Sequence, residues 1–387
     1  MRSGATDEAA AGAVIDATAG AVNDTPAGAM NDVVNGAVNG ATAGAGGRRD
    51  RPGGALRVAI LAALVVLLLA CPAWGDSGVR ATLIVFSYQA ALAVMWNLLA
   101  GYAGLVTFGQ QLFVGLGGYT LAVGCERLGL GVWPAFVLAA VVAAAVAVPV
   151  GALTFRLKGG YFAVGSWVVA EVFRLSFGNW AYVGHASGMF IRQARSVDPW
   201  LIYYVAVGLL IGVVALVVAA LRSRLGLALM AIRDAEDAAA SLGVHVWRVK
   251  LLAFVVAGAG TGLIAALLTV QTPFIQPNAA FSIQWSAAAS FMVVVGGLGT
   301  VEGPLIGAAI YVVLQQRLGA TGAIHLIVLG AVSVVIMLVA PRGIAGFARD
   351  RFGLQLFPVA RRPPAGKRRA AAPPMAPPGE PPADRGA

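Results

Sequence analysis

The chain has 387 residues, of which 59% are hydrophobic and only 11% are charged, and its mean hydropathy is +0.82. Soluble domains carry about a quarter charged residues, so this composition excludes an ordinary soluble globular protein. The net charge of +10 comes from 27 Lys and Arg against 17 Asp and Glu. Because most positive charges lie outside the apolar stretches, and no basic groove interleaved with aromatic residues is visible, the charge indicates membrane topology rather than nucleic-acid binding.

The N-terminal segment is built from Ala, Gly, Asn, Asp and Thr in loose repeats without aromatic residues. Such a segment cannot build a core, so we expect residues 1–54 to be a disordered tail. At the other end, residues 346–387 are basic and rich in proline, which predicts a second extended tail. Between the tails, residues 55–345 form the predicted transmembrane domain.

Long segments without any Asp, Glu, Lys or Arg lie between the two tails. Stretches of about 18 or more uncharged apolar residues are typical of transmembrane helices, because hydrocarbon cannot satisfy a lone charge. We therefore predict an all-α, polytopic helical bundle. The roughly ten expected spans are 56–74, 81–100, 104–125, 132–154, 161–177, 200–221, 251–271, 282–300, 303–318 and 323–341. Segments 161–177 and 303–318 are short, so each is a candidate for a re-entrant or broken helix.

Lys and Arg residues define the expected orientation. They gather before the first span, after the fourth, between the sixth and the seventh, and after the last. With ten spans all these groups lie on one side of the membrane, which the positive-inside rule makes the cytoplasmic side. Both termini and the central loop, residues 222–250, are then cytoplasmic. Segments 178–199 and 271–282 are external and become candidates for contact with an external partner.

Glycines crowd two segments, residues 101–120 and 296–311. In the second segment, Gly299, Gly303 and Gly307 repeat at four-residue spacing and would share one helix face. Small residues at this spacing favour close packing of helices. The alternative is that the glycines mark broken helices that line a path, where irregular backbone is tolerated.

Polar residues at membrane depth are candidates for function, because a bilayer makes them costly to keep. Those that stand out are Asn97, Gln110, Gln111, Glu171, Arg174, Gln271, Gln284 and Glu302. Glu171 and Arg174 are three residues apart, so we expect a neutralised structural pair on one helix face rather than a solute site. The candidate translocation path comprises Asn97, Gly104, Gln110, Gln111, Gly297, Gly299 and Glu302.

No catalytic or metal-binding pattern is visible in the sequence. There is no phosphate-binding loop, no HExxH and no GxSxG, and the histidines and cysteines lack metal-ligand spacing. We expect a transport protein that carries no catalytic residue, metal or cofactor of its own. Uphill movement of a solute would then draw on an ion gradient or on a partner that hydrolyses ATP.

The central loop contains a charged helical pattern, "ALMAIRDAEDAAASLGVHVWRVK", residues 228–250. As one helix that ends at Gly243, it places small apolar residues on one face and most charges on the other. The apolar face comprises Ala231, Ile232, Ala235, Ala238, Ala239 and Leu242. Arg233 and Asp237 are expected to pair across one turn. The small-residue face suits docking in a groove of a partner, although from periodicity alone a helix on the membrane surface fits equally well.

Several sequence blocks resemble one family of membrane proteins. The motif "DAAASLG", residues 237–243, resembles the EAA-x-x-x-G signature of ABC-importer permeases, with Asp in the Glu position and without the usual Ile-x-Leu-Pro continuation. The wider loop is similar to that of branched-chain amino-acid ABC permeases. So are "WNLLAGYAGLVTFGQQLFVGLGGYT", "LKGGYFAVGSWVVAEVFRL" and "MVVVGGLGTVEGPLIGAAIY". The resemblance spans residues 80–345, and the block "GGYFAVGSWVVAEVFRL" looks like the LivM-type subunit.

The resemblance implies that the chain is the permease subunit of an ABC importer in a bacterial plasma (inner) membrane. It implies two cytoplasmic ATPase subunits that carry ATP and magnesium, a second homologous permease subunit, and an extracytoplasmic substrate-binding protein. The residues that it assigns to ATPase coupling are Arg233, Asp234, Glu236, Asp237, Ala238, Ala239 and Gly243. Branched-chain amino acids are the expected cargo, with other amino acids, amides or urea as alternatives.

One position departs from the family pattern. Where the family usually shows Ser-Phe-Gly-His, this chain has Thr107-Phe108-Gly109-Gln110. Gln110 hydrogen-bonds but cannot carry a proton near neutral pH, so solute preference is expected to differ if this position contacts the solute.

A second class of function also fits the polytopic pattern. An ion-coupled secondary transporter, or a passive channel for amino acids or amides, would use ionisable residues at membrane depth as a relay. Glu171, Arg174 and Glu302 are the candidates for such a relay.

Overall fold

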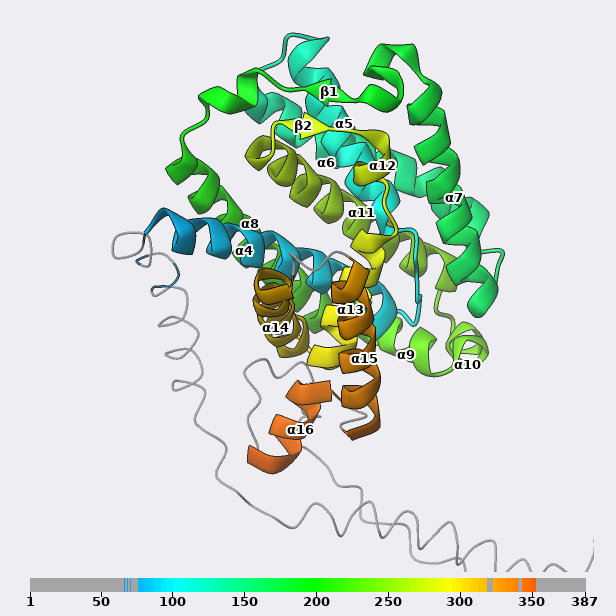
Figure 1. Cartoon of the computed structure of the whole chain (residues 1–387). Helices are drawn as coiled ribbons and strands as arrows, with labels where there is room; N and C mark the ends of the chain where they lie inside the picture. The colour runs from blue at the N-terminus through cyan, green and yellow to red at the C-terminus, as the bar shows by residue number, and fades with distance from the viewer. Residues whose placement is uncertain are drawn as a thin grey trace, which may run out of the picture. The chain divides into compact units, whose positions relative to one another are not determined.

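The computed structural model describes residues 66, 68, 70, 76–318, 323–339 and 343–352. These residues are mostly helical, as the all-α prediction requires (Figure 1). The helices of ten or more residues are α4 Ser77–Asn97, α5 Gln110–Glu126, α6 Val132–Thr154, α7 Gly160–Asn179, α8 Pro199–Arg222, α9 Arg224–Asp234, α11 Val246–Gln271, α13 Gln284–Gly296, α14 Glu302–Leu318, α15 Ala323–Val339 and α16 Gly343–Phe352. The shorter elements are η1 Leu98–Tyr102, η2 Ala181–Val183, η3 His185–Ser187, β1 Met189–Phe190, η4 Gln193–Ser196, α10 Glu236–Ser241, β2 Phe274–Ile275 and α12 Pro277–Ala280. The N-terminal tail, most of the first expected span and most of the C-terminal tail lie outside the described residues.

Several helical segments of the described residues are long and apolar enough to cross a membrane. They are Ser77–Tyr102, Val132–Thr154, Pro199–Arg222, Val246–Gln271 and Pro277–Gly296. A shorter apolar stretch, Ile327–Ile336, lies in α15. Length and composition of these helices identify a membrane protein that crosses the bilayer repeatedly.

The helix α4 occupies the centre of the helix bundle. Every residue from Ser87 to Asn97 is buried. This half of α4 is largely apolar around the whole helix, which is typical of a helix without a face for solvent or lipid. It packs against α8, α11, α13 and α14. A side chain at the end of α4 is therefore placed in the interior of the protein.

Helix α6 packs closely against α11 through a row of alanines, which we call the alanine stripe. Ala135, Ala139, Ala143 and Ala147 recur at every fourth position and are fully buried. On α11, a Cβ at Gly262 would lie only 2.7 Å from the Cβ of Ala143. Small side chains let the two backbones approach closely, which is the usual basis of helix packing in lipid. The opposite face of α6 exposes valines, as a lipid-facing surface would.

Two helix breaks interrupt the bundle. At the first, α4 continues as one π-helical turn, η1, and residues 103–109 then form a loop before α5. The span expected over 104–125 therefore begins only at Gln110. The second break is the turn at residues 297–301, between α13 and α14. The two short spans that were candidates for a break are continuous, as α7, which is 20 residues long, and α14.

The helices α13 and α14 form a close pair through glycine. A Cβ at Gly303 would lie 3.0 Å from the carbonyl carbon of Gly296, and a Cβ at Gly307 would lie 3.0 Å from the Cα of Met292. The predicted packing role is thus confirmed for Gly303 and Gly307. It is wrong for Gly299, which lies in the turn with a φ of +72° and shares no helix face with the other two. A left-handed residue reverses the chain there, and glycine adopts that conformation without a steric cost.

The two segments expected to be external pair with each other. Strands β1 and β2 are antiparallel, with Met189 opposite Ile275 and Phe190 opposite Phe274 (Figure 1). The amide of Ile191 also donates to the carbonyl of Pro273 at 3.0 Å. The segment before α8 is thereby joined to the segment after α11.

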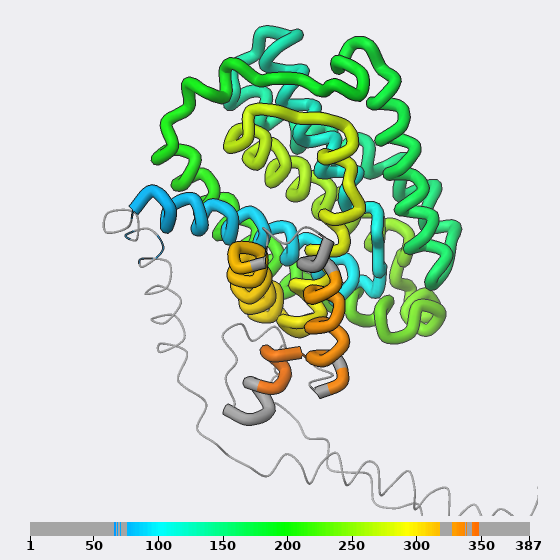
Figure 2. The backbone as a smooth tube through the Cα atoms, in the orientation of Figure 1, coloured from blue at the N-terminus to red at the C-terminus, as the bar shows by residue number. Residues whose placement is uncertain are grey.

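The strand pair lies at the opposite end of the long helices from α9 and α10. Helix α8 leads from the β1 side to α9, and α11 leads from α10 back to β2 (Figure 2). Since α11 has 26 residues, its length at 1.5 Å per residue is roughly 39 Å, which exceeds a hydrocarbon core of about 30 Å. Helix α11 is therefore long enough for its two ends to reach opposite sides of a membrane.

The alanine stripe makes a stability prediction. Replacing Ala143 with Leu forces extra volume into the α6–α11 contact and should destabilise the protein by about 1–3 kcal/mol. The matched control is Val141→Leu, because Val141 is 58% exposed on the other face of α6. Thermal unfolding of the two purified variants in nanodiscs measures the difference, and equal midpoints would contradict the packing argument.

Candidate functional site

The central loop folds as two helices rather than one. Helix α9 ends at Asp234, and Ala235 then adopts an extended conformation with φ −156° and ψ 96° before α10 begins. The prediction of one continuous helix is therefore wrong, because the chain breaks in the middle of the periodic pattern. The predicted end at Gly243 is confirmed: its φ is +84°, and its amide donates to Ala240 O at 2.9 Å.

The break rearranges the expected faces and ion pairs. On the predicted apolar face only Ile232 and Ala239 are buried, whereas Leu242 is 85% exposed. The remaining alanines of that face are exposed as well. The predicted Arg233–Asp237 pair is wrong: Arg233 pairs with the neighbouring Asp234 at 2.9 Å. Another acidic residue of the loop, Glu236, pairs with Lys250 of α11 at 2.7 Å.

Arg233 connects the loop to the first helix break. Its Nη1 donates to the carbonyl oxygen of Gly101, in the π-helical turn η1, at 2.8 Å. Gly104 lies beneath the same side chain, since a Cβ there would be 3.2 Å from Cγ of Arg233. Gly104 also has a φ of +70°, which L side chains rarely adopt.

Asn97 connects the first break to the second. Its Nδ2 donates to the carbonyl oxygen of Thr300 at 2.8 Å, and its Oδ1 accepts from the amide of Gly299 at 2.9 Å. Gly101 is wedged between these groups, because a Cβ there would lie 2.7 Å from the amide nitrogen of Gly299. The side chain of Asn97 thus satisfies a backbone donor and a backbone acceptor of the 297–301 turn.

These contacts form one continuous structure, which we call the joint. It consists of Asn97, Gly101, Gly104, Arg233 and Gly299. The joint brings together α4, the π-helical turn, the α13–α14 turn and the central loop, although its residues are more than 200 positions apart at the extremes. π-Helical turns inside α-helices are often found at functional sites.

A cluster of buried polar side chains lies beyond the joint, around the start of α5. Nε2 of Gln110 donates to the hydroxyl of Thr261 on α11 at 2.8 Å. The hydroxyl of Ser286, on α13, donates to Oε1 of Gln111. The hydroxyl of Thr107 donates to Ser166 on α7 at 3.0 Å and accepts from the amide of Gly109 at 3.0 Å. We call this set, with Thr107, Gln110, Gln111, Thr261 and Ser286, the polar cluster.

Each glutamine of the polar cluster has one amide atom that finds no partner among the described residues. Oε1 of Gln110 and Nε2 of Gln111 are both buried and bond to no group in this part of the chain. Because an amide is a donor at one end and an acceptor at the other, this holds whichever way each amide is turned. A buried polar group without a partner costs about 1–3 kcal/mol, so both amide atoms would gain from a hydrogen bond to a ligand or to water.

A cavity lies one helical turn along α5 from the polar cluster. It has a volume of about 280 Å³ and lies between α5, α11, β2, α12 and α13. Its wall is largely apolar and includes Val114, Leu268, Ile275 and Trp285. The indole Nε1 of Trp285 donates to the carbonyl of Ala279 at 3.0 Å, which holds the ring in place. Val114 follows Gln111 by one turn and Trp285 precedes Ser286, so the cavity and the polar cluster are neighbours.

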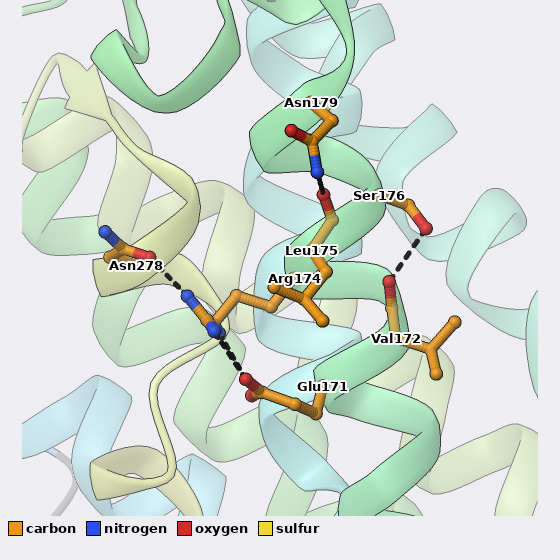
Figure 3. A network of polar contacts seen from close by, with 7 residues as sticks. All are labelled: Glu171, Val172, Arg174, Leu175, Ser176, Asn179 and Asn278. Atoms are coloured by element: carbon orange, nitrogen blue, oxygen red, sulfur yellow. Dashed lines mark hydrogen bonds and ion pairs between the residues drawn. The ribbon is translucent and has the colours of Figure 1, made fainter.

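The expected Glu171–Arg174 pair is confirmed. Nε of Arg174 donates to Oε1 of Glu171 at 2.8 Å, and Nη1 reaches Asn278 in α12 at 2.5 Å (Figure 3). Arg174 therefore ties α7 to the segment that follows β2. Both charged groups are occupied with each other and with a structural contact, as the prediction of a neutralised pair requires.

The comparisons with known proteins identify the family. The model of the branched-chain amino acid transport system permease component matches residues 78–340. The chain belongs to this family. It is 29% identical to the high-affinity branched-chain amino acid transport system permease protein LivM of Escherichia coli K12, over 76% of each chain. It is 28% identical to the permease protein of the same name from Salmonella typhimurium LT2, also over 76% of each chain. No solved structure matches.

The permease brings the predicted path residues together in two places. Asn97, Gly104 and Gly299 lie in the joint, and Gln110 and Gln111 lie in the polar cluster. Two others flank the second helix break: Gly297 begins the turn, and Glu302 begins α14, where an acidic side chain is favoured by the helix dipole.

The sequence reasoning missed several residues that the permease fold places in these sites. Three residues contact predicted residues but were not singled out, namely Gly101, Thr261 and Ser286. Gly101 lies in a segment whose glycines were noticed. Nothing in the sequence around Thr261 and Ser286 indicates that their hydroxyls bond to another helix, because a hydroxyl in a transmembrane helix usually bonds the backbone of its own helix.

The turn of the joint makes a second stability prediction. Replacing Gly299 with Ala places a side chain at a φ of +72° and should cost about 1–2 kcal/mol. Gly78→Ala is the control, because a Cβ at Gly78 meets nothing within 4 Å and the residue lies in α4. Tryptophan fluorescence during thermal unfolding reports both variants. An unchanged midpoint for Gly299→Ala would show that the turn tolerates a different conformation.

Proposed function

We infer that this chain is the transmembrane subunit of an ABC importer for branched-chain amino acids or related small polar solutes. The observation that carries this inference is the family match, which spans the described helices from α4 to the last residues of α15 and includes the central loop. The contacts of the joint add a physical reason, because the loop that would meet an ATPase is bonded to the interrupted helices at the centre of the bundle. No residue of this chain is required to do chemistry.

The proposed topology has about ten spans, with both termini and the α9–α10 segment in the cytoplasm. The distribution of Lys and Arg supports this orientation. The β1–β2 pair then lies outside, since it is at the opposite end of α8 and α11. By analogy with the family, the membrane is the inner membrane of a bacterium.

The proposed assembly contains two ATPase subunits, a second homologous permease subunit and an extracytoplasmic binding protein. The ATPases carry ATP and magnesium, so this chain needs no cofactor. Helix α10 suits an ATPase groove, because Ala238 and the C-cap residue Leu242 are exposed while the buried Ala239 packs the helix against the protein. Exposed small and aliphatic side chains on a short helix permit a close fit with a partner.

The proposed path for the solute runs past the polar cluster and the cavity. The cavity is apolar and, at about 280 Å³, is close to the size of a small ligand site. The unpartnered amide atoms of Gln110 and Gln111 would offer hydrogen bonds to the polar end of a passing solute. An apolar wall beside unused polar groups suits a molecule with an aliphatic side chain and a polar head.

Retention of the ATPases tests the assembly. We expect Ala238→Trp to reduce the amount of ATPase that co-purifies with the permease several-fold, because the larger side chain blocks the fit of α10. Ala181→Trp is the matched control, since Ala181 is exposed at the other end of the bundle, in η2. Uptake that persists after deletion of every associated ATPase would contradict the importer and favour the ion-coupled or passive alternative.

Substitution of Gln110 tests the path. Gln110→Met keeps the length of the side chain and removes both the unpartnered Oε1 and the hydrogen bond to Thr261, so the gain and the cost oppose each other and stability should change little. Uptake should nevertheless fall by about tenfold, which corresponds to the loss of one hydrogen bond of roughly 1.4 kcal/mol to the solute. Thermal unfolding and solute uptake are measured on the same preparation. Full uptake by the variant would remove Gln110 from the path.

A further inference from the structure

Arg233 is held in one orientation by its neighbour. Oδ1 of Asp234 accepts a hydrogen bond from Nε of Arg233 at 2.9 Å and forms an ion pair with Nη2, also at 2.9 Å. With these two contacts in place, Nη1 is directed at the carbonyl oxygen of Gly101, 2.8 Å away. A planar guanidinium can make all three contacts at once, whereas the single ammonium of a lysine cannot.

The carbonyl that Arg233 binds lies at the most crowded point of the joint. A Cβ at Gly101 would meet both the Asn97 side chain and the amide of Gly299. A Cβ at Gly299 would lie 3.2 Å from the oxygen of Gly101 and 3.3 Å from Nη1 of Arg233. There is consequently no room for Gly101 to move without displacing the 297–301 turn.

Asn97 adds hydrogen bonds between the end of α4 and the 297–301 turn. It bonds the amide of Gly299 and the carbonyl of Thr300, and it stands on the last turn of α4. The end of α4 is thus linked to the α13–α14 turn by two hydrogen bonds, and Gly101 of the π-helical turn that follows it adds a direct contact. Closely packed interiors transmit a displacement rather than absorb it.

We propose that Arg233 is a positioning residue that carries movement of the α9–α10 segment to both helix breaks together. When the segment shifts, the guanidinium pulls on the carbonyl of Gly101, and the joint moves the π-helical turn and the 297–301 turn as one unit. Asp234 keeps the guanidinium directed at its acceptor. This role rests on the proposed function, since it requires a partner that displaces the segment.

The test uses the assembled importer, with its ATPases and binding protein, reconstituted in proteoliposomes. Arg233→Lys and Arg233→Gln are compared with Arg224→Gln, which removes an exposed charge from the same loop. The measured quantity is the number of ATP molecules hydrolysed per solute transported. We expect both Arg233 variants to keep their ATPases and to hydrolyse ATP, while this ratio rises about tenfold, the effect of losing one charge-assisted hydrogen bond. The control should keep the ratio of the unmodified protein.

A variant of Asp234 separates the orientation of the Arg233 guanidinium from its charge. Asp234→Asn keeps the guanidinium but weakens the acceptor that directs it, and Asp234 is exposed enough for the protein to fold without it. We expect a smaller rise in the ratio than in Arg233→Gln. Because a purely structural role would lower hydrolysis and transport in proportion, an unchanged ratio in all three variants overturns the proposal.

The proposed ABC importer and the proposed role of Arg233 are contradicted by different results. If the unmodified permease retains no ATPase, the proposal of an ABC importer is wrong. If the complex forms and transports normally, and the Arg233 variants remain coupled, only the role of Arg233 is wrong.

Discussion

A helix that breaks inside a packed bundle leaves backbone groups without their helical partners, so the surrounding protein must supply new ones. In this permease the side chain of Asn97 performs that task for the 297–301 turn, with one donated and one accepted hydrogen bond. The loop at 103–109 is satisfied in a similar way, since the indole of Trp96 donates to the carbonyl of Thr107. The central position of α4 follows from this requirement, because both breaks depend on residues near its end.

The polar cluster lowers the stability of the fold, whereas the hydrogen bonds of Asn97 raise it. Its two glutamines each retain an unused amide atom in a buried site, and this lowers stability rather than raising it. In the joint the polar groups are matched and the glycines leave no space, which makes a rigid unit. The proposed function uses both properties: a rigid link that would transmit movement, and a path lining whose free amide atoms would bind a solute. The two sites are adjacent on the chain, at the two ends of the loop between α4 and α5.

Much of the helical organisation was predictable from composition and periodicity. Runs of uncharged residues predicted the long helices, and a glycine at the end of a periodic pattern predicted the end of α10 at Gly243. Errors arose where a pattern continued through a break. The spacing of Gly299, Gly303 and Gly307 is the same whether the chain is helical or turns at the first of them. The amphipathic pattern of the central loop likewise continues through the extended Ala235, because hydrophobic periodicity carries little information about a single residue's φ and ψ.

The amino-acid sequence was enough to establish that this protein crosses a membrane, which family it resembles, and which polar residues at membrane depth are candidates for function. It could not determine which of those residues meet. Asn97 and Gly299 are 202 positions apart, and Arg233 is 132 positions from Gly101. Their contacts arise because α4, α9 and the α13–α14 turn converge in the folded protein. These contacts could be found only in the folded protein. The packing of distant helices sets which group a polar side chain meets in a bilayer, and the neighbouring residues in the sequence carry no signal of that partner.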